Sequence, residues 1–312
     1  MINRFSSHWI LIVALLSFGI PFHARAVGKP SALKHKMFPS DPLLDRKVKF
    51  WEQIFTTYSS DQMVIHDKDT PDLIVAVLAN RRNLKVDNRP RAFSKMLEDF
   101  ADNGPKAAQL SPAHKKIWKL YSKDSAAKSR LISGRVELRT QIGLSDVFHN
   151  AALRAQLYLP RMEKIFKQHG LPPELTRIPF VESMFNVKAR SKVGASGIWQ
   201  LMPDAARPHI IVNRRTDERS SPLRATHAAA KILKANYAGL KNWPLAITAY
   251  NHGANGVKRG VTKLGSSNLS DLILSYRSPS FGFASKNFYA EFLAAERSYG
   301  KWQSKQMATA SR

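Results

Sequence analysis

Apolar residues recur at helical spacing along most of this chain, and prolines or glycines interrupt them. In the first such segment they fall on one helix face: Leu43, Leu44, Val48, Trp51, Ile54 and Phe55. Pro71, Pro90 and Pro112 stand where the first turn of a helix tolerates proline. No hairpin signal and no alternating run of any length occurs. The pattern predicts a mainly α protein.

Prolines, glycines and changes in composition divide the chain into four parts. We expect a signal peptide over residues 1–26, a helical N-terminal region over 27–144, a second region over 145–303 that carries the chemical motifs, and a short basic tail over 304–312. The N-terminal region contains no chemical motif, so its role is open. After the helical segment that starts near Pro42, its expected elements are a short strand or extended link over 62–67 and four further helices over 71–78, 90–101, 112–122 and 126–141.

Charge and the first residues indicate where the protein works. The formal net charge is +26, which favours an anionic polymer as partner. Arg4 precedes an apolar run over residues 9–20, and ARA over 24–26 fits a signal-peptidase site. The run is shorter than the roughly 20 residues that span a bilayer, so we expect cleavage and no integral membrane span in the mature form. Export argues against nucleic acid and leaves lipid headgroups, polysaccharide and peptidoglycan.

The absence of cysteine excludes several kinds of chemistry. Disulfides, thiol catalysis, thiolate metal sites and a lipid-modified N-terminal cysteine all require a residue that this chain lacks. The ten histidines show no His-Glu-x-x-His spacing, so we expect neither metal nor cofactor. The protein is therefore predicted to be periplasmic or secreted, and not a lipoprotein.

Glu182 differs from the other carboxylates of the C-terminal half in having apolar neighbours. It lies in IPFVESMF (residues 178–185), at the end of a predicted helix. Apolar surroundings favour the protonated form of a carboxylic acid, which suits a general acid near neutral pH. The alternative is a side chain that projects to solvent. Most other carboxylates of this half have charged or polar neighbours and are interpreted as solvated, and Glu182 alone is singled out.

Two later segments offer groups that suit sugars. In GASGIWQLMP (residues 194–203) the glycines allow close backbone approach, and Trp199, Gln200 and Met202 supply a flat face, an amide and a soft apolar surface. AYNHG (residues 249–253) adds a phenol and an amide at a helix end. No segment is decisive alone, and Trp199 by itself is better explained as a core residue.

Together these segments resemble the catalytic domain of the soluble lytic transglycosylases. The resemblance rests on PFVESMF (179–185), GIWQLMP (197–203) and AYNHG (249–253) in this order. It is nearest to the membrane-bound lytic transglycosylase D branch, whose segments carry Trp-Gln, and LPPEL (171–175) also fits that branch. The resemblance covers about residues 145–300.

This resemblance implies a lysozyme-like transglycosylase domain over residues 145–303, with Glu182 as its single catalytic acid. In the family mechanism the acid protonates the oxygen between N-acetylmuramic acid and N-acetylglucosamine, and the acetamido group stabilises C1. The same carboxylate then takes the proton of the muramoyl 6-hydroxyl, which closes a 1,6-anhydro ring. The implied partner is the peptidoglycan glycan strand; no protein partner is indicated.

The resemblance also implies which residues line the sugar subsites. These are Ser183, Gln200, Met202, Tyr250 and Asn251. Tyr250 is expected to hydrogen-bond near Glu182, while Ser183 could equally well brace the helix. One departure is clear: relatives carry a glutamate in a late segment, where this chain has Ala284 or Ser285.

Three other functions stay open from sequence. A muramidase would use the same Glu182 with water as acceptor and would favour a second carboxylate, for which Asp204 and Asp217 are candidates. A non-catalytic wall-binding protein would have no reason to keep an acid in an apolar setting. A secreted nucleic-acid binder would interleave basic and stacking aromatic residues, whereas the aromatics here fall mostly on apolar stripes.

Overall fold

The computed structural model describes residues 37–80 and 89–310. The predicted signal peptide (1–26) lies outside the described residues. The N-terminal part consists, in chain order, of α2 (Pro42–Thr56), β1 (Gln62–Asp67), β2 (Ile74–Ala79), α3 (Arg89–Asn103), the 3₁₀ helix η2 (Gly104–Gln109), α4 (Pro112–Tyr121), α5 (Ser125–Ile132) and β3 (Leu138–Ile142). Among the described residues, no helix is both long and apolar enough to cross a membrane.

The three strands form one antiparallel sheet with β1 in the middle, in the order β2-β1-β3. The extended segment expected over 62–67 is confirmed as β1. The helix expected over 71–78 is wrong: a run of β-branched and apolar residues there forms β2. The helix expected over 126–141 ends at Ile132, because Gly134 adopts a left-handed φ of 65° and the chain then enters β3.

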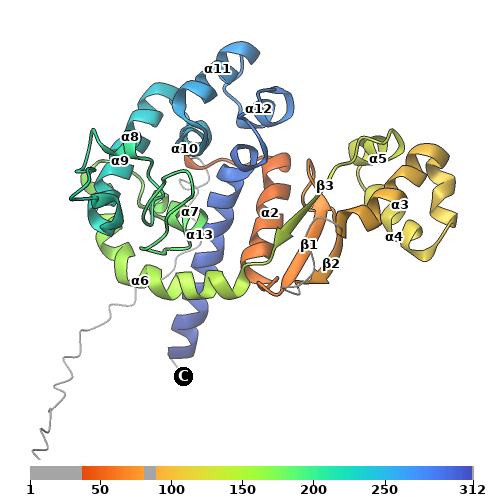
Figure 1. Ribbon diagram of the computed structural model, residues 1–312, viewed down its shortest axis with the longest axis horizontal. Helices are drawn as coiled ribbons and strands as arrows, with labels where there is room; N and C mark the ends of the chain where they lie inside the picture. Colours follow the sequence, from red (N-terminus) through yellow and green to blue (C-terminus); the bar gives the residue numbers. More distant parts are fainter. Residues whose placement is uncertain (1–36, 81–88, 311–312) are drawn as a thin grey trace, which may run out of the picture.

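Helices α3, α4 and α5 form a small cluster beyond the sheet, on the side away from α2 (Figure 1). The helices expected over 90–101 and 112–122 are confirmed as α3 and α4. Phe100 stacks on Trp118 with ring centroids 5.9 Å apart, and both belong to a second apolar core with Ile117 and Tyr121. These aromatic residues therefore hold the cluster together.

The C-terminal part is wholly helical in its regular elements. In chain order it contains α6 (Ser145–Gln168), the 3₁₀ helix η3 (Pro173–Arg177), α7 (Ile178–Glu182), α8 (Pro203–Ala206), the 3₁₀ turn η4 (Glu218–Ser220), α9 (Pro222–Leu240), α10 (Trp243–His252), α11 (Ala254–Leu264), α12 (Leu269–Ser275) and α13 (Phe283–Ala310). The mainly α class is confirmed, and the sheet is an addition to it.

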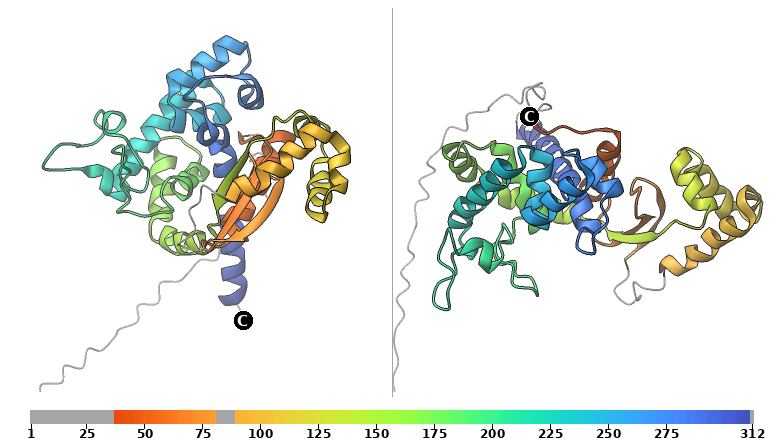
Figure 2. Two further views of the ribbon diagram at one scale, coloured as in Figure 1. Left: turned by 45° about the vertical axis from the view of Figure 1, so that its right-hand side comes forward. Right: turned by 90° about the horizontal axis from the view of Figure 1, so that it is seen from above.

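The main core joins α2 to the C-terminal helices. Figures 1 and 2 show α13 running through this part of the molecule with α2 along its side, and the two helices pack together. Phe38, just before α2, meets Phe292 of α13 with ring centroids 5.3 Å apart, and Phe55 stacks on Phe148 of α6 at 5.2 Å. Thus α2 is buried in the same core that supports α7.

Candidate active site

Glu182 is the last residue of α7, a short helix fixed by aromatic packing. Phe180 is fully buried and contacts Phe148, Phe185 and Tyr299 of α13 with ring centroids 4.8, 4.6 and 5.1 Å apart. Glu182 is half-buried as a residue, and burial raises the pKa of its carboxyl to about 8. The carboxyl is therefore protonated at neutral pH and can donate a proton.

The backbone directly after Glu182 has an unusual conformation. Met184 and Phe185 have φ values of 50° and 55°, a left-handed region that costs of the order of 1–3 kcal/mol for such residues. The Phe185 N–H donates to the Pro179 carbonyl at 3.2 Å, and Arg154 Nη2 donates to the Met184 carbonyl at 2.7 Å. These bonds hold the sharp turn that ends the helix at Glu182.

The glycine-containing loop approaches another backbone segment closely. Gly197 has φ of 75°, and a Cβ there would lie 1.9 Å from the Arg219 carbonyl oxygen. Arg219 is itself buried and donates through Nη1 to the carbonyls of Gly194 and Leu201 at 2.7 and 2.9 Å. The loop is thereby fixed from both of its ends, and only glycine fits at residue 197.

Trp199 and Gln200 have mainly structural contacts. Trp199 is fully buried, stacks on Phe166 with ring centroids 5.5 Å apart, and donates to Thr226 Oγ1 at 2.9 Å. It is a core residue and offers no exposed flat face. Gln200 has φ of 45°, and its Nε2 donates to the carbonyls of Gly197 and Ala189 at 2.8 and 3.2 Å.

Ser183 and Tyr250 both bind the backbone of the glycine-containing loop. Ser183 Oγ donates to the Ile198 carbonyl at 2.9 Å, and Tyr250 Oη donates to the Trp199 carbonyl at 2.8 Å. Burial and the nearby Glu182 charge raise the Tyr250 pKa well above its usual value. Tyr250 therefore lies near Glu182, as expected, but its hydroxyl proton goes to the loop and not to the carboxylate.

Asn251 and Met202 are the exposed members of the predicted set. Met202 precedes α8 with 42% of its surface exposed. Asn251 Oδ1 accepts a hydrogen bond from Ser285 Oγ at 3.0 Å, and the same hydroxyl lies 3.3 Å from His252 Nδ1. Ser285, rather than Ala284, is thus the residue of the late segment that contacts the predicted subsite.

The two carboxylates considered as partners of Glu182 are engaged elsewhere. Asp217 binds Arg219 through both oxygens at 2.9 and 2.8 Å, and these bonds lower its pKa. Asp204 is exposed and pairs with Arg207 at 2.6 Å. Neither geometry presents a carboxylate to Glu182.

Glu291 of α13 is the residue that sequence reasoning missed. Burial, with the Glu182 charge as a second cause, raises its pKa to about 8, and Lys47 lowers it. The sequence did not single it out, because it comes near Glu182 only where α13 packs against α7. The available signal was its apolar setting between Ala290 and Phe292, which resembles that of Glu182.

Comparisons with known proteins show which of them the central part of this chain is similar to. The model of the transglycosylase SLT domain matches residues 162–273. Membrane-bound lytic murein transglycosylase D of Escherichia coli (strain K12) is 32% identical over 115 residues, which are 36% of this chain and 25% of that protein. A protein of Alteromonas sp. (strain M-1) named for tributyltin chloride resistance is 30% identical over 125 residues, 39% of this chain and 60% of that one.

A solved structure, an inactive mutant of the lytic transglycosylase Slt from Pseudomonas aeruginosa, gives a TM-score of 0.41 at 19% identity over 73% of this chain and 39% of that chain. The match to the transglycosylase SLT domain, over residues 162–273, includes Glu182. The aligned region spans about a quarter of the length of the Escherichia coli relative.

Proposed function

We propose that this protein is a peptidoglycan lytic transglycosylase that cleaves the β-1,4 bond between N-acetylmuramic acid and N-acetylglucosamine. The observation that carries the proposal is Glu182 within the SLT domain, held at a helix end and protonated at neutral pH because burial raises its pKa to about 8. The similarity to murein transglycosylase D supports the choice of substrate.

The proposed reaction consumes no water. Glu182 gives its proton to the bridging oxygen, the C1–O bond breaks, and the muramoyl acetamido oxygen stabilises the positive charge at C1. The ionised Glu182 then takes the proton of the muramoyl 6-hydroxyl while that oxygen bonds to C1. The products are a new N-acetylglucosamine end and a 1,6-anhydro-muramoyl end, and Glu182 is again protonated.

The surrounding residues are assigned roles in the same proposal. Met202 and Asn251 are exposed enough to contact sugar directly. The side chains of Ser183, Gln200 and Tyr250 donate hydrogen bonds to backbone carbonyls near Glu182, and these bonds position the loop. Their remaining surfaces line the subsite. The predicted signal peptide places this activity in the periplasm or outside the cell.

A muramidase is the second candidate, and Glu291 is the observation that favours it. A hydrolase of this bond commonly uses a second carboxylate, either to activate water or to act as nucleophile. Glu291 is close enough to Glu182 for their charges to interact. In this alternative Glu182 would still protonate the leaving oxygen, and Glu291 would take a proton from the attacking water.

Digestion of purified sacculi tests the proposal. Mass spectrometry of the soluble fragments should show muropeptides lighter by one water than their reducing counterparts, and Glu182→Gln should abolish them. Glu291→Gln is the matched control, since it removes a neighbouring carboxyl of the same size. Reducing ends alone, lost in both variants, would establish the muramidase. Binding to sacculi without any product would leave a wall-binding protein.

A further inference from the structure

A strongly basic cavity of about 360 Å³ lies where the N-terminal part meets the C-terminal helices. It is bounded by α2, the turn between β1 and β2, α5, the segment from α12 to α13 and the first turn of α13. Its charged lining consists of five cations and one acid: Lys47, Lys68, Arg130, Arg277, Lys286 and Asp69. Such a concentration of positive charge favours an anionic ligand.

Lys47 of α2 is the buried cation of this cavity. Only 3% of its surface is exposed, and its Nζ donates to Asn287 Oδ1 at the long distance of 3.4 Å. The same oxygen accepts from Trp51 Nε1 at 3.4 Å. Within the described residues no carboxylate lies within ion-pair distance of Lys47, and burial lowers its pKa to about 8. A buried ammonium without a counter-ion is costly, and an anion would relieve that cost.

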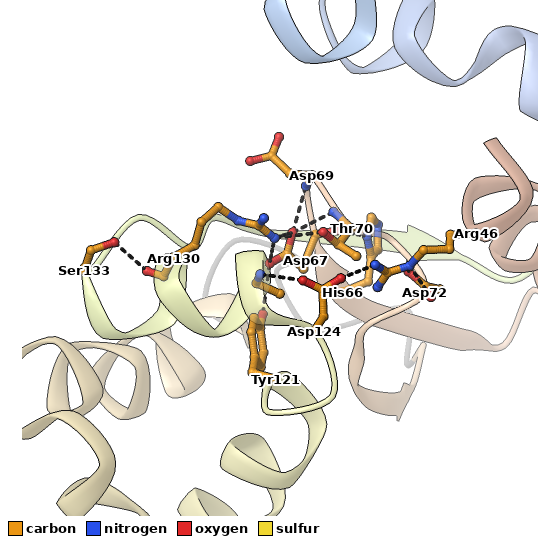
Figure 3. Close-up of polar contacts among 11 residues, drawn as sticks. Arg46, His66, Asp67, Asp69, Thr70, Asp72, Tyr121, Asp124, Arg130 and Ser133 are labelled. Carbon is orange, nitrogen blue, oxygen red and sulfur yellow. Dashed lines mark hydrogen bonds and ion pairs between the residues drawn. The ribbon is translucent and has the colours of Figure 1, made fainter. Parts of the chain in front are cut away.

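Two of the cavity's other four cations are already ion-paired: Lys68 with Glu137 at 2.6 Å and Arg130 with Asp67 at 3.1 Å. Arg277 and Lys286 take part in no ion pair in the described part of the chain, and burial followed by the Arg277 charge lowers the Lys286 pKa. Arg130 is held by Asp67 at 3.1 Å and by Thr70 at 2.8 Å (Figure 3). Its orientation is thereby fixed at the cavity wall.

Asp69 does not neutralise this group of cations. Figure 3 shows its carboxylate without a dashed contact, while its backbone N–H donates to Asp67 Oδ1 at 2.8 Å. Asp69 raises the pKa of Lys47 only through space. The Asp69 carboxylate therefore does not balance the positive charges of Lys47, Arg277 and Lys286. The remaining positive charge favours binding of a further anion.

The cavity is adjacent to the acid pair. Asn287, which contacts Lys47, lies one helical turn before Glu291 on α13. The Lys47 charge acts on Glu291, and so does the Glu182 charge. A ligand held at Lys47 would thus be close to a glycan strand positioned at Glu182.

We propose that this cavity binds carboxylate groups of the peptide that the glycan strand carries on its muramoyl residues. The inference rests on the proposed function, because the charged groups of peptidoglycan near the scissile bond are these carboxylates. The volume suits a few peptide atoms with their carboxylates, whereas a bare ion needs less space. Lysine and arginine side chains bind carboxylates through charge-assisted hydrogen bonds.

Calorimetry with a soluble stem tetrapeptide tests this inference without requiring cleavage. The full chain should bind the peptide, and the same peptide with its carboxylates converted to carboxamides should bind at least about tenfold more weakly. Lys286→Met and Arg277→Gln, both at the cavity rim, should each weaken binding about tenfold, and Lys47→Met should do so if it folds. Lys305→Met, an exposed lysine on the same helix, is the matched control and should bind like the original chain.

Each outcome separates this inference from the proposed function. Equal binding of the peptide and its carboxamide form, or unchanged binding by the rim variants, would overturn the cavity assignment even if sacculi are cleaved. Inorganic phosphate that binds the cavity as tightly as the peptide would also overturn it. Peptide binding that depends on these cations, in a protein that fails to cleave sacculi, would support the cavity and count against the transglycosylase.

Discussion

Two half-buried glutamates with raised pKa values distinguish this site at the level of single residues. Glu182 and Glu291 each have a pKa raised to about 8, chiefly by burial. Their proximity means that ionising one disfavours ionisation of the other, so the pair titrates as a unit. One proton is therefore retained over the pH range in which a general acid is useful.

Glu182→Gln should abolish activity and stabilise the fold at alkaline pH. Loss of the general acid should cost at least about 10²–10⁴-fold in rate. An acid with a folded pKa of about 8 and an unfolded value near 4.5 lowers stability as pH rises between these values. The variant should thus gain on the order of 4 kcal/mol in the free energy of unfolding at pH 8 and little at pH 4, measured by denaturant titration. An equal gain at both pH values would contradict this account.

Glu291→Gln should leave the cleavage reaction the same and change how its rate depends on pH. In the original chain activity should fall as pH rises through about 8, because Glu182 must be protonated to react. Removing the neighbouring negative charge lowers the Glu182 pKa, so this alkaline limb should move to lower pH. The measurement is the release of soluble muropeptides against pH, and an unmoved limb would show that the two carboxyls are not coupled.

At the scale of elements, the loop over residues 194–203 and α7 define the site together. The loop is fixed by Arg219, and the hydroxyls of Ser183 and Tyr250 bind its carbonyls. Met184 and Gln200, which directly follow Ser183 and Trp199, both have left-handed φ values. The surrounding hydrogen bonds offset this local strain.

Gly197→Ala should destabilise the protein more than Gly194→Ala. Both residues have positive φ, so both variants carry backbone strain of about 1 kcal/mol. A Cβ at residue 197 would in addition lie 1.9 Å from the Arg219 carbonyl, whereas one at residue 194 meets nothing within 4 Å. We expect a loss of about 2–4 kcal/mol for Gly197→Ala in thermal or denaturant unfolding. Equal losses would show that the close approach is not maintained in solution.

The sequence predicted helices better than strands for a physical reason. The segments that became α3 and α4 begin at proline and carry apolar residues at helical spacing. The segment that became β2 is a short apolar run after Pro71, which periodicity alone cannot assign to helix or strand. It is a strand because it pairs with β1, and such pairing depends on residues distant in sequence.

In the site, too, the sequence predicts what depends on neighbouring residues and misses what depends on residues far apart in the chain. Glu182 could be found because its apolar neighbours are adjacent in the chain. Glu291 lies over a hundred residues later and meets Glu182 only because α13 packs against α7. The basic cavity likewise requires α2, the β1–β2 turn and α13 to converge. Motifs therefore predicted the acid, while its surroundings depended on tertiary packing.

At the scale of the whole molecule, the region that carries the motifs shares its apolar core with the N-terminal part of the chain. Helix α2 packs along α13, and Arg46 of α2 binds Asp72 and Asp124 in the N-terminal part (Figure 3). The main apolar core contains residues from both regions. The N-terminal part therefore supports the helix that carries Glu291.

A fragment of residues 145–310 should fail to fold, because it exposes the face of α13 that α2 covers. Circular dichroism and thermal unfolding should show no cooperative transition. The matched control replaces residues 81–136 with a flexible linker of about 12 residues, which removes α3, α4 and α5 but keeps α2 and the sheet strands. This control should unfold cooperatively, and a stable 145–310 fragment would contradict the shared core.

Digestion of sacculi in water labelled with heavy oxygen tests the central claim most directly. A transglycosylase transfers the muramoyl C1 to the sugar's own 6-hydroxyl, so the new muramoyl ends should contain no label and should be 1,6-anhydro. The account predicts this result for the original chain and no product for Glu182→Gln. Incorporation of heavy oxygen at C1 of the new muramoyl ends would contradict it and would establish hydrolysis, with Glu291 as the base to test next.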